Sequence, residues 1–396
     1  MRESSIAEEF RERIDRFQHL LIEQGIDGAL VVHKIDLYYL TGTDQNAVLF
    51  VPASDQPLLM VRKSYERAIQ DTEIDHIIRL TSLSQMAESM KNHSGKKISR
   101  LGLELDILPV NLFLAYQKQF PDSEMLDIST LLRSVRMVKS SYEIACLKKA
   151  AEIADRLFEQ VPDFLRESET EIDLALRAEA FYRRHGHPGL SRMRGFNMEA
   201  VYGHIMAGPS GAVPSASPGP TGGYGPGPYL SQGAGHAKIE PHEPILVDYT
   251  SNVEGYISDQ SRIFSKGELP EKYYRAHEVM RQVQQAVAQQ GKPGAKAKDL
   301  YDLASGIVEK AGIFEGFMGY PEPVPFVGHG LGLELDEWPI IGKRSEHVLE
   351  KGMIIALEPK FIFPGEGVVG IENTFVVTGK GMEKLNRFPD DIVAVP

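Results

Sequence analysis

The chain has 396 residues, of which 42% are hydrophobic and 25% charged, values typical of folded globular proteins and not of disordered chains. This length allows about two or three domains of ordinary size. The net charge of −12 argues against nucleic acid and against an anionic membrane as the main partner of the protein.

The start of the chain, MRESSIAEEFRERI, is charged throughout and has no apolar stretch typical of a signal peptide. Cys146 is the single cysteine, so the sequence excludes an internal disulfide and does not indicate an oxidising compartment. The sequence also lacks a run of about 18 apolar residues, which would predict a membrane span. We therefore expect a cytoplasmic protein.

Helices and strands alternate in the first third of the chain. Residues 6–24 have apolar side chains at helical spacing and predict an amphipathic helix that ends at Gly25. Short apolar runs bounded by turn residues predict buried strands at 28–32, 47–51, 57–61, 76–80 and 100–105. Helical segments separate the later strands, and this alternation predicts an α/β domain over residues 1–135.

The middle of the chain combines two strong helices with an unusual segment. Residues 141–160 and 169–185 predict helices, the second capped by Thr170 or Ser168. Residues 207–235 are dominated by Gly, Pro and Ser. We interpret this segment either as a flexible surface loop or as a lid or pocket wall, because loops of this length are uncommon inside a compact domain.

The last part of the chain returns to β character around a pair of helices. The patterns predict helices at 271–290 and 297–310, and strands at 244–250, 256–264, 353–359 and 367–378. This order, with mostly antiparallel pairing, predicts an α+β domain over residues 136–396. Its helices are expected on one side of a curved sheet.

Acidic residues stand inside the apolar strands of this second domain. Four of them stand in predicted strands with apolar flanks: Asp248, Asp259, Glu358 and Glu372. A buried carboxylate is costly unless it is paired or bound to a metal. Because Arg262 and Lys360 are the only cations near them in these strands, salt bridges alone do not explain the pattern.

His329 adds an imidazole to this set. It stands in VGHGLGL, where flanking glycines allow close backbone approach, and we expect a loop there. Two hairpins can bring the carboxylates to one end of a sheet, which favours His329 as a metal ligand over a structural histidine. Oxygen ligands with one imidazole suit Mn, Co, Fe or Zn. Four carboxylates can hold two metal ions about 3.5–4 Å apart, an arrangement that activates water for hydrolysis.

These motifs resemble the family of methionine aminopeptidases, aminopeptidase P, prolidase and creatinase (peptidase family M24), which share the pita-bread fold. VDYTSNVEGYISDQSRIF, GHGLGL, ALEPKF and GIENTFVVT are similar to the family stretches that carry the metal ligands, here Asp248, Asp259, His329, Glu358 and Glu372. IDGALVVHKIDLYYLTGTDQNAVLFV resembles the N-terminal domain of the aminopeptidase P, prolidase and creatinase branch. The resemblance implies a homodimer and two divalent metal ions, with manganese expected and cobalt, iron or zinc as alternatives.

The sequence departs from the family pattern at three positions. Ser215 and Asp336 stand where family peptidases usually have histidines, and Gly370 stands where aminopeptidase P and prolidase commonly have an arginine. Such groups would bind substrate and stabilise the transition state. His204 or His236 is a candidate for the first role, against the alternative that both are loop or surface histidines. Asp336 would accept a hydrogen bond from a cationic substrate.

Three functions are therefore considered. The first is an Xaa-Pro aminopeptidase or dipeptidase, in which the resemblance implies a metal-bound hydroxide that attacks the scissile amide, with Glu358 as proton shuttle. The second is a small-molecule C–N hydrolase or lyase of the creatinase or ectoine hydrolase type, favoured by the missing histidines and arginine. The third, a non-catalytic binding protein, is disfavoured because buried carboxylates are expensive to retain without a metal. The expected partner is a peptide or small-molecule amide, not nucleic acid or a membrane.

Overall fold

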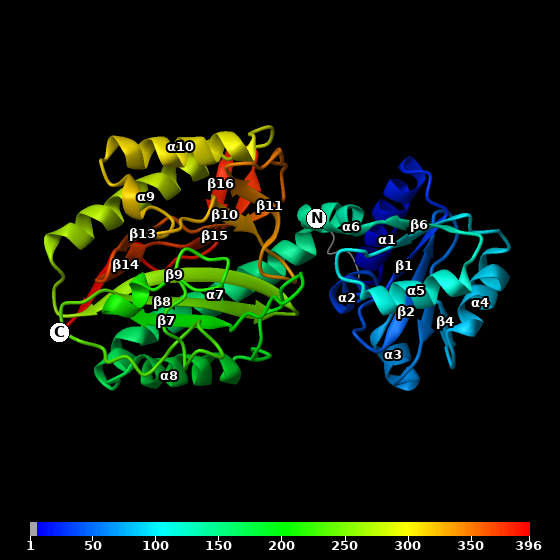
Figure 1. Ribbon diagram of the computed structural model, residues 1–396, viewed down its shortest axis with the longest axis horizontal. Helices are drawn as coiled ribbons and strands as arrows, with labels where there is room; N and C mark the ends of the chain where they lie inside the picture. The colour runs from blue at the N-terminus through cyan, green and yellow to red at the C-terminus, as the bar shows by residue number, and fades with distance from the viewer. Residues whose placement is uncertain (1–5) are drawn as a thin grey trace. The chain divides into compact units, whose positions relative to one another are not determined.

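The computed structural model describes residues 6–396, and the chain divides into two compact units (Figure 1). The N-terminal unit contains the residues up to Arg136 together with Arg194–Asn197. The C-terminal unit contains Met137–Met193 and Met198–Pro396. Each unit buries hydrophobic clusters of its own, as separate domains do.

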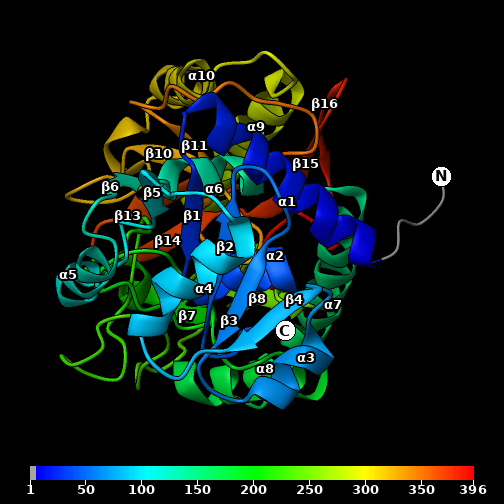
Figure 2. The same ribbon diagram turned by 90° about the vertical axis from the view of Figure 1, so that its right-hand side faces the viewer.

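A mixed sheet with strand order β4–β3–β2–β1–β5–β6 forms the centre of the N-terminal unit, and Figure 2 shows β2, β3 and β4 side by side. Its strands are β1 Gly28–Val31, β2 Ala47–Pro52, β3 Leu58–Val61, β4 His76–Arg79, β5 Arg100–Leu103 and β6 Glu124–Asp127. The strands predicted from apolar runs are all present. The structure adds β6, whose sequence EMLD is too short and polar to stand out.

Helices pack against this sheet. They are α1 Ile6–Glu23, α2 Lys34–Thr41, α3 Tyr65–Asp71, α4 Ser84–Ser94, α5 Val110–Gln119 and α6 Ser129–Met137. The predicted amphipathic helix α1 buries Phe17 and Leu21 completely, and it contacts β1 and β2. From α4 and α5, Met90 and Tyr116 join a hydrophobic cluster with sheet residues such as Phe50. Burial of these side chains stabilises the unit.

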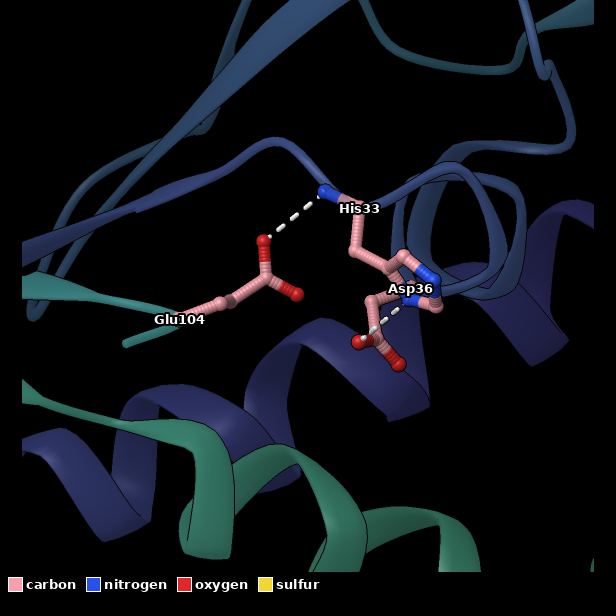
Figure 3. A group of neighbouring side chains, drawn as sticks. All are labelled: His33, Asp36 and Glu104. Carbon is pink, nitrogen blue, oxygen red and sulfur yellow. Dashed lines mark hydrogen bonds and ion pairs between the residues drawn. The ribbon is translucent and has the colours of Figure 1, made fainter. Parts of the chain in front are cut away.

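A buried ion network joins α2 to the end of β5 in this unit. Asp36 accepts hydrogen bonds from Arg136 at 2.7 Å and from Arg194 at 2.5 Å. Glu104 accepts the backbone N–H of His33 at 2.9 Å (Figure 3). Although burial opposes it, Arg136 holds the pKa of Asp36 well below its usual value. His33, Asp36 and Glu104 lie close enough to share a metal ion. We nevertheless interpret the cluster as structural, because two guanidinium groups already balance its charge.

The C-terminal unit begins with two capped helices, α7 Ser141–Arg166 and α8 Glu171–Arg184. Each starts with a capping box, which in α8 joins Thr170 to Asp173. Both helices contact the sheet with strand order β17–β9–β8–β7. Its strands are β7 Gly203–Ala207, β8 Ile245–Val253, β9 Tyr256–Lys266 and β17 Val393–Val395.

A second helix pair, α9 Glu271–Gln290 and α10 Ala297–Lys310, has the predicted bounds and lies along the opposite side of this unit (Figure 1). These helices pack with the sheet of order β11–β10–β12–β15–β16 and with the hairpin β13–β14 around an extensive hydrophobic cluster. The strands are β10 Phe326–Gly330, β11 Glu337–Gly342, β12 Ile354–Leu357, β13 Lys360–Phe363, β14 Gly367–Gly370, β15 Asn373–Thr378 and β16 Gly381–Lys384. A short 3-10 helix, Phe314–Gly316, precedes β10. The mixture of helices with mostly antiparallel strands is the predicted α+β class. The two helix pairs, however, pack against different sheets and do not share one side of a single sheet.

Two of the predicted strands differ in an informative way. The strand predicted at 367–378 is divided into β14 and β15, and the strand predicted at 353–359 ends early, at Leu357 of β12. Both differences arise because the chain passes from the β10–β12 sheet into the separate hairpin β13–β14 and back. Pro359, which has no N–H to donate to a ladder, stands at the first break. Glu358 and Glu372 therefore lie at the breaks between strands and not within them.

The Gly/Pro-rich segment is a long loop whose ends are tied together. After β7 it forms a short 3-10 helix, Gly208–Ala212, and then continues without helix or strand to β8. Glu171 at the start of α8 binds both ends of the loop. Its Oε1 accepts the N–H of Ala207, and its Oε2 accepts the N–H of Gly235, each at 2.8 Å.

Candidate metal centre

The predicted ligand residues converge in the C-terminal unit. Asp248 and Asp259 lie on the neighbouring strands β8 and β9, His329 lies on β10, Glu358 follows β12 and Glu372 precedes β15. All of them line one cavity of about 90 Å³. Asp259, His329, Glu358 and Glu372 are at most 6% exposed. Segments that are far apart in the sequence thus contribute to a single buried cluster.

The glycines beside His329 allow the strands to approach, as their pattern predicts, but the residue lies on β10 and not in a loop. A Cβ atom on Gly328 would stand 2.5 Å from the backbone oxygen of Ala356. A Cβ atom on Gly330 would stand 2.2 Å from that of Trp338. Because β10 lies between β11 and β12, a larger residue at either position would collide with the backbone of a neighbouring strand.

The imidazole of His329 is oriented by its own strand. Its Nδ1 lies 3.0 Å from the backbone oxygen of Gly330, which can only accept, so Nδ1 carries the hydrogen. Nε2 faces Glu358 Oε1 at 3.6 Å and Glu372 Oε1 at 4.0 Å. Although burial lowers it, the carboxylates of Asp336, Glu358 and Glu372 raise the pKa of His329 above its usual value. A fixed Nδ1–H leaves Nε2 as the nitrogen available to a metal.

Lys360 stands among the carboxylates. Its Nζ donates to Glu358 Oε2 at 2.8 Å and to Glu372 Oε2 at 3.0 Å, and it lies 3.3 Å from Asp248 Oδ2. Although burial opposes it, these three carboxylates hold the pKa of Lys360 well above its usual value. Lys360, one of the two cations noted near these carboxylates in the sequence, therefore forms ion pairs with three of them. The signal in the sequence was the two-residue spacing of Glu358 and Lys360, which puts both on one face of an extended chain.

The remaining donor atoms fit a divalent cation. One atom each from Asp259, His329 and Glu372 lie within 4.8 Å of one another. Asp259 Oδ1 is buried and has no hydrogen-bond partner among residues 6–396. Burial, together with the negative charge of Glu372, holds the pKa of Asp259 well above its usual value. A cation ligated here would give the orphaned oxygen a partner and offset the excess negative charge.

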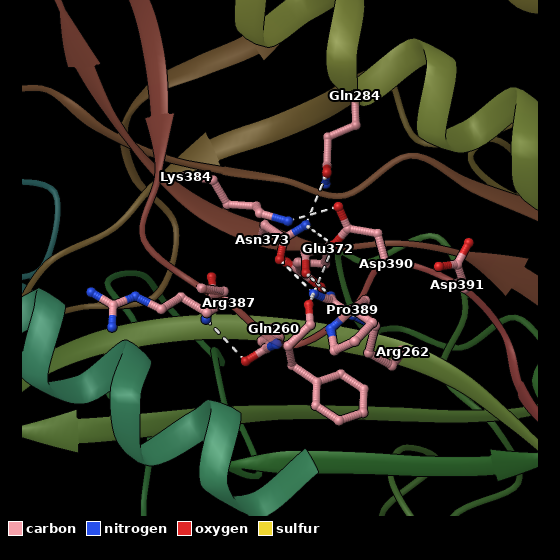
Figure 4. A network of polar contacts seen from close by, with 12 residues as sticks. Gln260, Arg262, Gln284, Glu372, Asn373, Lys384, Arg387, Pro389, Asp390 and Asp391 are labelled. Carbon is pink, nitrogen blue, oxygen red and sulfur yellow. Dashed lines mark hydrogen bonds and ion pairs between the residues drawn. The ribbon is translucent and has the colours of Figure 1, made fainter. Parts of the chain in front are cut away.

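Arg262, the other cation near the ligand strands, belongs to a separate polar network with Asn373 and Asp390 (Figure 4). It donates to the backbone oxygen of Glu372 at 2.8 Å, to Asn373 Oδ1 at 2.8 Å and to Asp390 Oδ1 at 2.9 Å. Although burial opposes it, Arg262 and Lys384 together lower the pKa of Asp390. Arg262 therefore supports the main chain at Glu372 and leaves the carboxylate to the site.

Comparison with known proteins identifies this arrangement. The model of the creatinase/prolidase N-terminal domain matches residues 13–138, and that of metallopeptidase family M24 matches residues 145–379, more than half of the chain. The chain belongs to metallopeptidase family M24. Members of this family use divalent metal ions, so this M24 chain is a metallohydrolase with a creatinase-like N-terminal domain and a pita-bread domain.

Relatives of this M24 chain match over nearly their full length. The Xaa-Pro dipeptidase of Lactobacillus delbrueckii subsp. lactis is 29% identical over 394 residues, which is 97% of this chain and 99% of the relative. That of Pyrococcus furiosus is 25% identical, over 95% of this chain and 98% of the relative. The solved structure of an Xaa-Pro dipeptidase from Bacillus anthracis has a TM-score of 0.83 at 26% identity, and it covers 97% of this chain and 99% of that one. Within residues 6–396, this M24 chain has no helix that is long and apolar enough to cross a bilayer.

The other candidate residues of this M24 site separate into two groups. His204 and Asp336 line the cavity, whereas His236 is exposed and stands outside its lining. His204 lies on β7 directly opposite Asp248 in the ladder, and loss of solvent around the ring lowers the pKa of His204. Ser215 also stands outside the lining, where its Oγ accepts the N–H of Ser217 at 3.1 Å. His204 is therefore the histidine that the structure brings to the site.

Gly370 leaves no room for an arginine. It pairs with Lys360 in the β13–β14 hairpin. A Cβ atom on Gly370 would stand 2.5 Å from the backbone oxygen of Pro359 and 2.7 Å from Lys360 Cα. The position where an arginine is expected from the family therefore lies directly opposite Lys360 in this hairpin.

The Gly/Pro-rich loop forms part of the cavity wall. Ser217, Pro218 and Gln232 from this loop line the cavity with the ligand residues. Gln232 is held in place by a hydrogen bond of 3.0 Å from its side-chain nitrogen to the backbone oxygen of Glu199. These contacts favour the pocket-wall interpretation over that of a free surface loop.

Proposed function

We propose that this M24 enzyme is an Xaa-Pro dipeptidase-like hydrolase that cleaves the amide bond before proline in a dipeptide or short peptide. One observation carries the proposal: the donor atoms of Asp259, His329 and Glu372 lie within 4.8 Å of one another and line one cavity with Glu358. The Xaa-Pro dipeptidases that match over nearly the whole chain support the choice of substrate. A bound divalent ion, for which we propose manganese, would lower the pKa of a water and polarise a carbonyl oxygen there.

Glu358 is proposed as the group that moves a proton. Its Oε1 faces the His329 side of the cavity, and its Oε2 is held by Lys360 at 2.8 Å. A carboxylate fixed in this way can accept a proton from the attacking water and deliver it to the leaving nitrogen. The fixed position of one oxygen favours transfer through the other, because the acceptor is already oriented.

His204 and Asp336 are proposed to contact the substrate from opposite parts of the lining. His204 can donate to an oxygen of the substrate beside Asp248. Asp336, whose Oδ1 lies 3.2 Å from His329 Nδ1, supports the imidazole and presents negative charge to the cavity. That charge favours a substrate with a free ammonium group, as dipeptides have.

A small-molecule amide is the second candidate. The cavity of about 90 Å³ is small. The tight packing at Gly370 also excludes the arginine that the proline-specific relatives commonly carry at this position. Both observations favour a compact substrate with a C–N bond, of the kind cleaved by creatinase-type enzymes. A homodimer, which the family resemblance implies, and a cytoplasmic location, which the sequence pattern favours, complete the proposal.

The test is release of proline from a panel of Xaa-Pro dipeptides and Xaa-Pro-Yaa tripeptides by the manganese-loaded protein. Asp259→Ala serves as the background, and the exposed His236→Ala serves as a folded control. We expect cleavage by the wild type and by His236→Ala, and none by Asp259→Ala. Failure of the manganese-loaded wild type to cleave the whole panel would reject the dipeptidase proposal in favour of a small-molecule amide.

A further inference from the structure

In each of the two glutamates of the site, one carboxylate oxygen faces His329 and the other faces Lys360. Glu358 Oε1 and Glu372 Oε1 face His329 Nε2, at 3.6 Å and 4.0 Å. Their Oε2 atoms instead accept hydrogen bonds from Lys360 Nζ, at 2.8 Å and 3.0 Å. One side of the glutamate pair therefore faces the imidazole of His329, near which Asp259 also offers a ligand atom, and the other side faces an ammonium group.

We propose that the ammonium group of Lys360 takes the place of one of the two metal ions, so that the site binds a single divalent cation. The ligands of this ion are Asp259, His329, Glu358 and Glu372. Asp248 serves as a partner of the ammonium group and not as a metal ligand. The inference rests on the proposed metal-dependent function, because a site that binds no metal has no ion to count.

The distances show why the ammonium group and a second ion exclude each other. Lys360 Nζ lies 2.8–3.3 Å from one oxygen each of Asp248, Glu358 and Glu372. A divalent transition metal needs carboxylate oxygens at about 2.0–2.2 Å. An ion bound to these same oxygens would lie among them, within contact distance of Nζ and with like charge. One of the two cations must leave.

Lys360 is built into its position. Of the three N–H donors of the ammonium group, two hydrogen-bond to Glu358 and Glu372, and Asp248 Oδ2 forms an ion pair with Nζ at 3.3 Å. The side chain is 2% exposed, so moving Nζ away from the carboxylates would leave a buried charge without partners, which is strongly unfavourable. Gly370, directly opposite in the hairpin, provides the space, because even a Cβ atom there would stand 2.9 Å from Lys360 Cγ.

The first experiment counts metal ions. The purified full-length chain is stripped with a chelator and titrated with Mn²⁺ alone. Bound manganese is then measured by calorimetry and by elemental analysis after gel filtration. We expect one equivalent for the wild type, one for the exposed control Lys310→Ala, and a second equivalent for Lys360→Ala. Two equivalents in the wild type, or one in a folded Lys360→Ala variant, would overturn the inference.

A second experiment does not depend on the folding of a Lys360 variant. Asp248→Asn and Asp259→Asn remove one charge each from neighbouring strands. If Asp248 binds the ammonium group, Asp248→Asn weakens Mn²⁺ affinity by less than about tenfold, through charge alone. Asp259→Asn removes a ligand and weakens affinity by more than about 100-fold. Equal losses in the two variants would show that both aspartates bind metal.

These outcomes are separate from the fate of the proposed function. A wild type that binds two equivalents and releases proline keeps the dipeptidase proposal and rejects the single-ion site. A wild type that binds one equivalent but cleaves no Xaa-Pro peptide keeps the single-ion site and rejects the proposed substrate. Frozen-solution electron paramagnetic resonance gives a further criterion, because an isolated Mn²⁺ ion and an exchange-coupled pair have different spectra.

Discussion

Substitution of Gly370 by alanine tests the packing that positions Lys360. The new Cβ atom would stand 2.5 Å from the backbone oxygen of Pro359 and 2.7 Å from Lys360 Cα. Ordinary carbon contacts are about 3.5–4.0 Å, so the overlap is close to an ångström. Both atoms are backbone, and the strain cannot be relieved by turning a side chain. The hairpin β13–β14 must open instead, at a cost of about 2 kcal/mol, as for other overpacked sites.

The matched control is Gly306→Ala in α10, where an added Cβ atom meets nothing within 4 Å. Alanine is favoured over glycine inside a helix by about 1 kcal/mol. Trp338, the only tryptophan of the chain, lies on β11 of the C-terminal unit, and its fluorescence reports the unfolding of that unit. For a domain of this size, about 2 kcal/mol lowers the melting temperature by about 4–8 °C. Gly370→Ala melting at or above Gly306→Ala would refute the packing argument.

Four further predictions concern the site and the fold around it. Glu358→Gln is expected to reduce proline release by about 10²–10⁴-fold, the usual contribution of a proton-transfer group, and full turnover would exclude that role. His204→Ala should reduce kcat/KM by more than tenfold, on the order expected for a group that contacts substrate, while His236→Ala stays near the wild type. Asp390→Asn should lower the melting temperature at pH 7. Because the pKa of Asp390 is depressed on folding, this difference should shrink as the pH falls below about 4 and through the folded pKa, and a constant difference from pH 7 to 3 would contradict the ion-pair network. Thr170→Ala removes the capping box of α8 and should cost about 1 kcal/mol, measured by thermal unfolding.

The parts of the fold that were predictable are those with strong local signals. The helices α9 and α10 have the predicted bounds, because the helical spacing of apolar residues can be recognised over a few turns of sequence. The strands β7, with sequence GHIMA, and β11, with sequence EWPIIG, were missed. Their glycines and a proline lower the local strand signal. Whether they form strands depends on pairing with segments that are far away in the chain. Pairing across sheets is a tertiary property that a local pattern does not contain.

The residues of the candidate site were likewise predictable only where the local sequence carries a signal. Asp248 and Asp259 stand out in the sequence because they are acidic residues in predicted buried strands, and His329 stands out because glycines flank it. The structure brings the three to one cavity with the two glutamates. The sequence identified Lys360 only as a cation near these carboxylates, because the direction of its side chain depends on a pairing that a local pattern does not contain. The tight hairpin β13–β14, which Gly370 permits, turns this side chain inward.

The hydrogen bonds of Glu171 to both ends of the Gly/Pro-rich loop affect how the sequence of this loop can change during evolution. The carboxylate holds the backbone N–H groups of Ala207 and Gly235, and neither hydrogen bond involves the residues between them. Doubling the length of a closed loop costs only about 0.6 kcal/mol of chain entropy. Insertions and deletions between the clamped ends can therefore accumulate with little loss of stability. Since this loop walls the cavity at Ser217, Pro218 and Gln232, new substrate preferences can arise there without altering the residues proposed to bind metal.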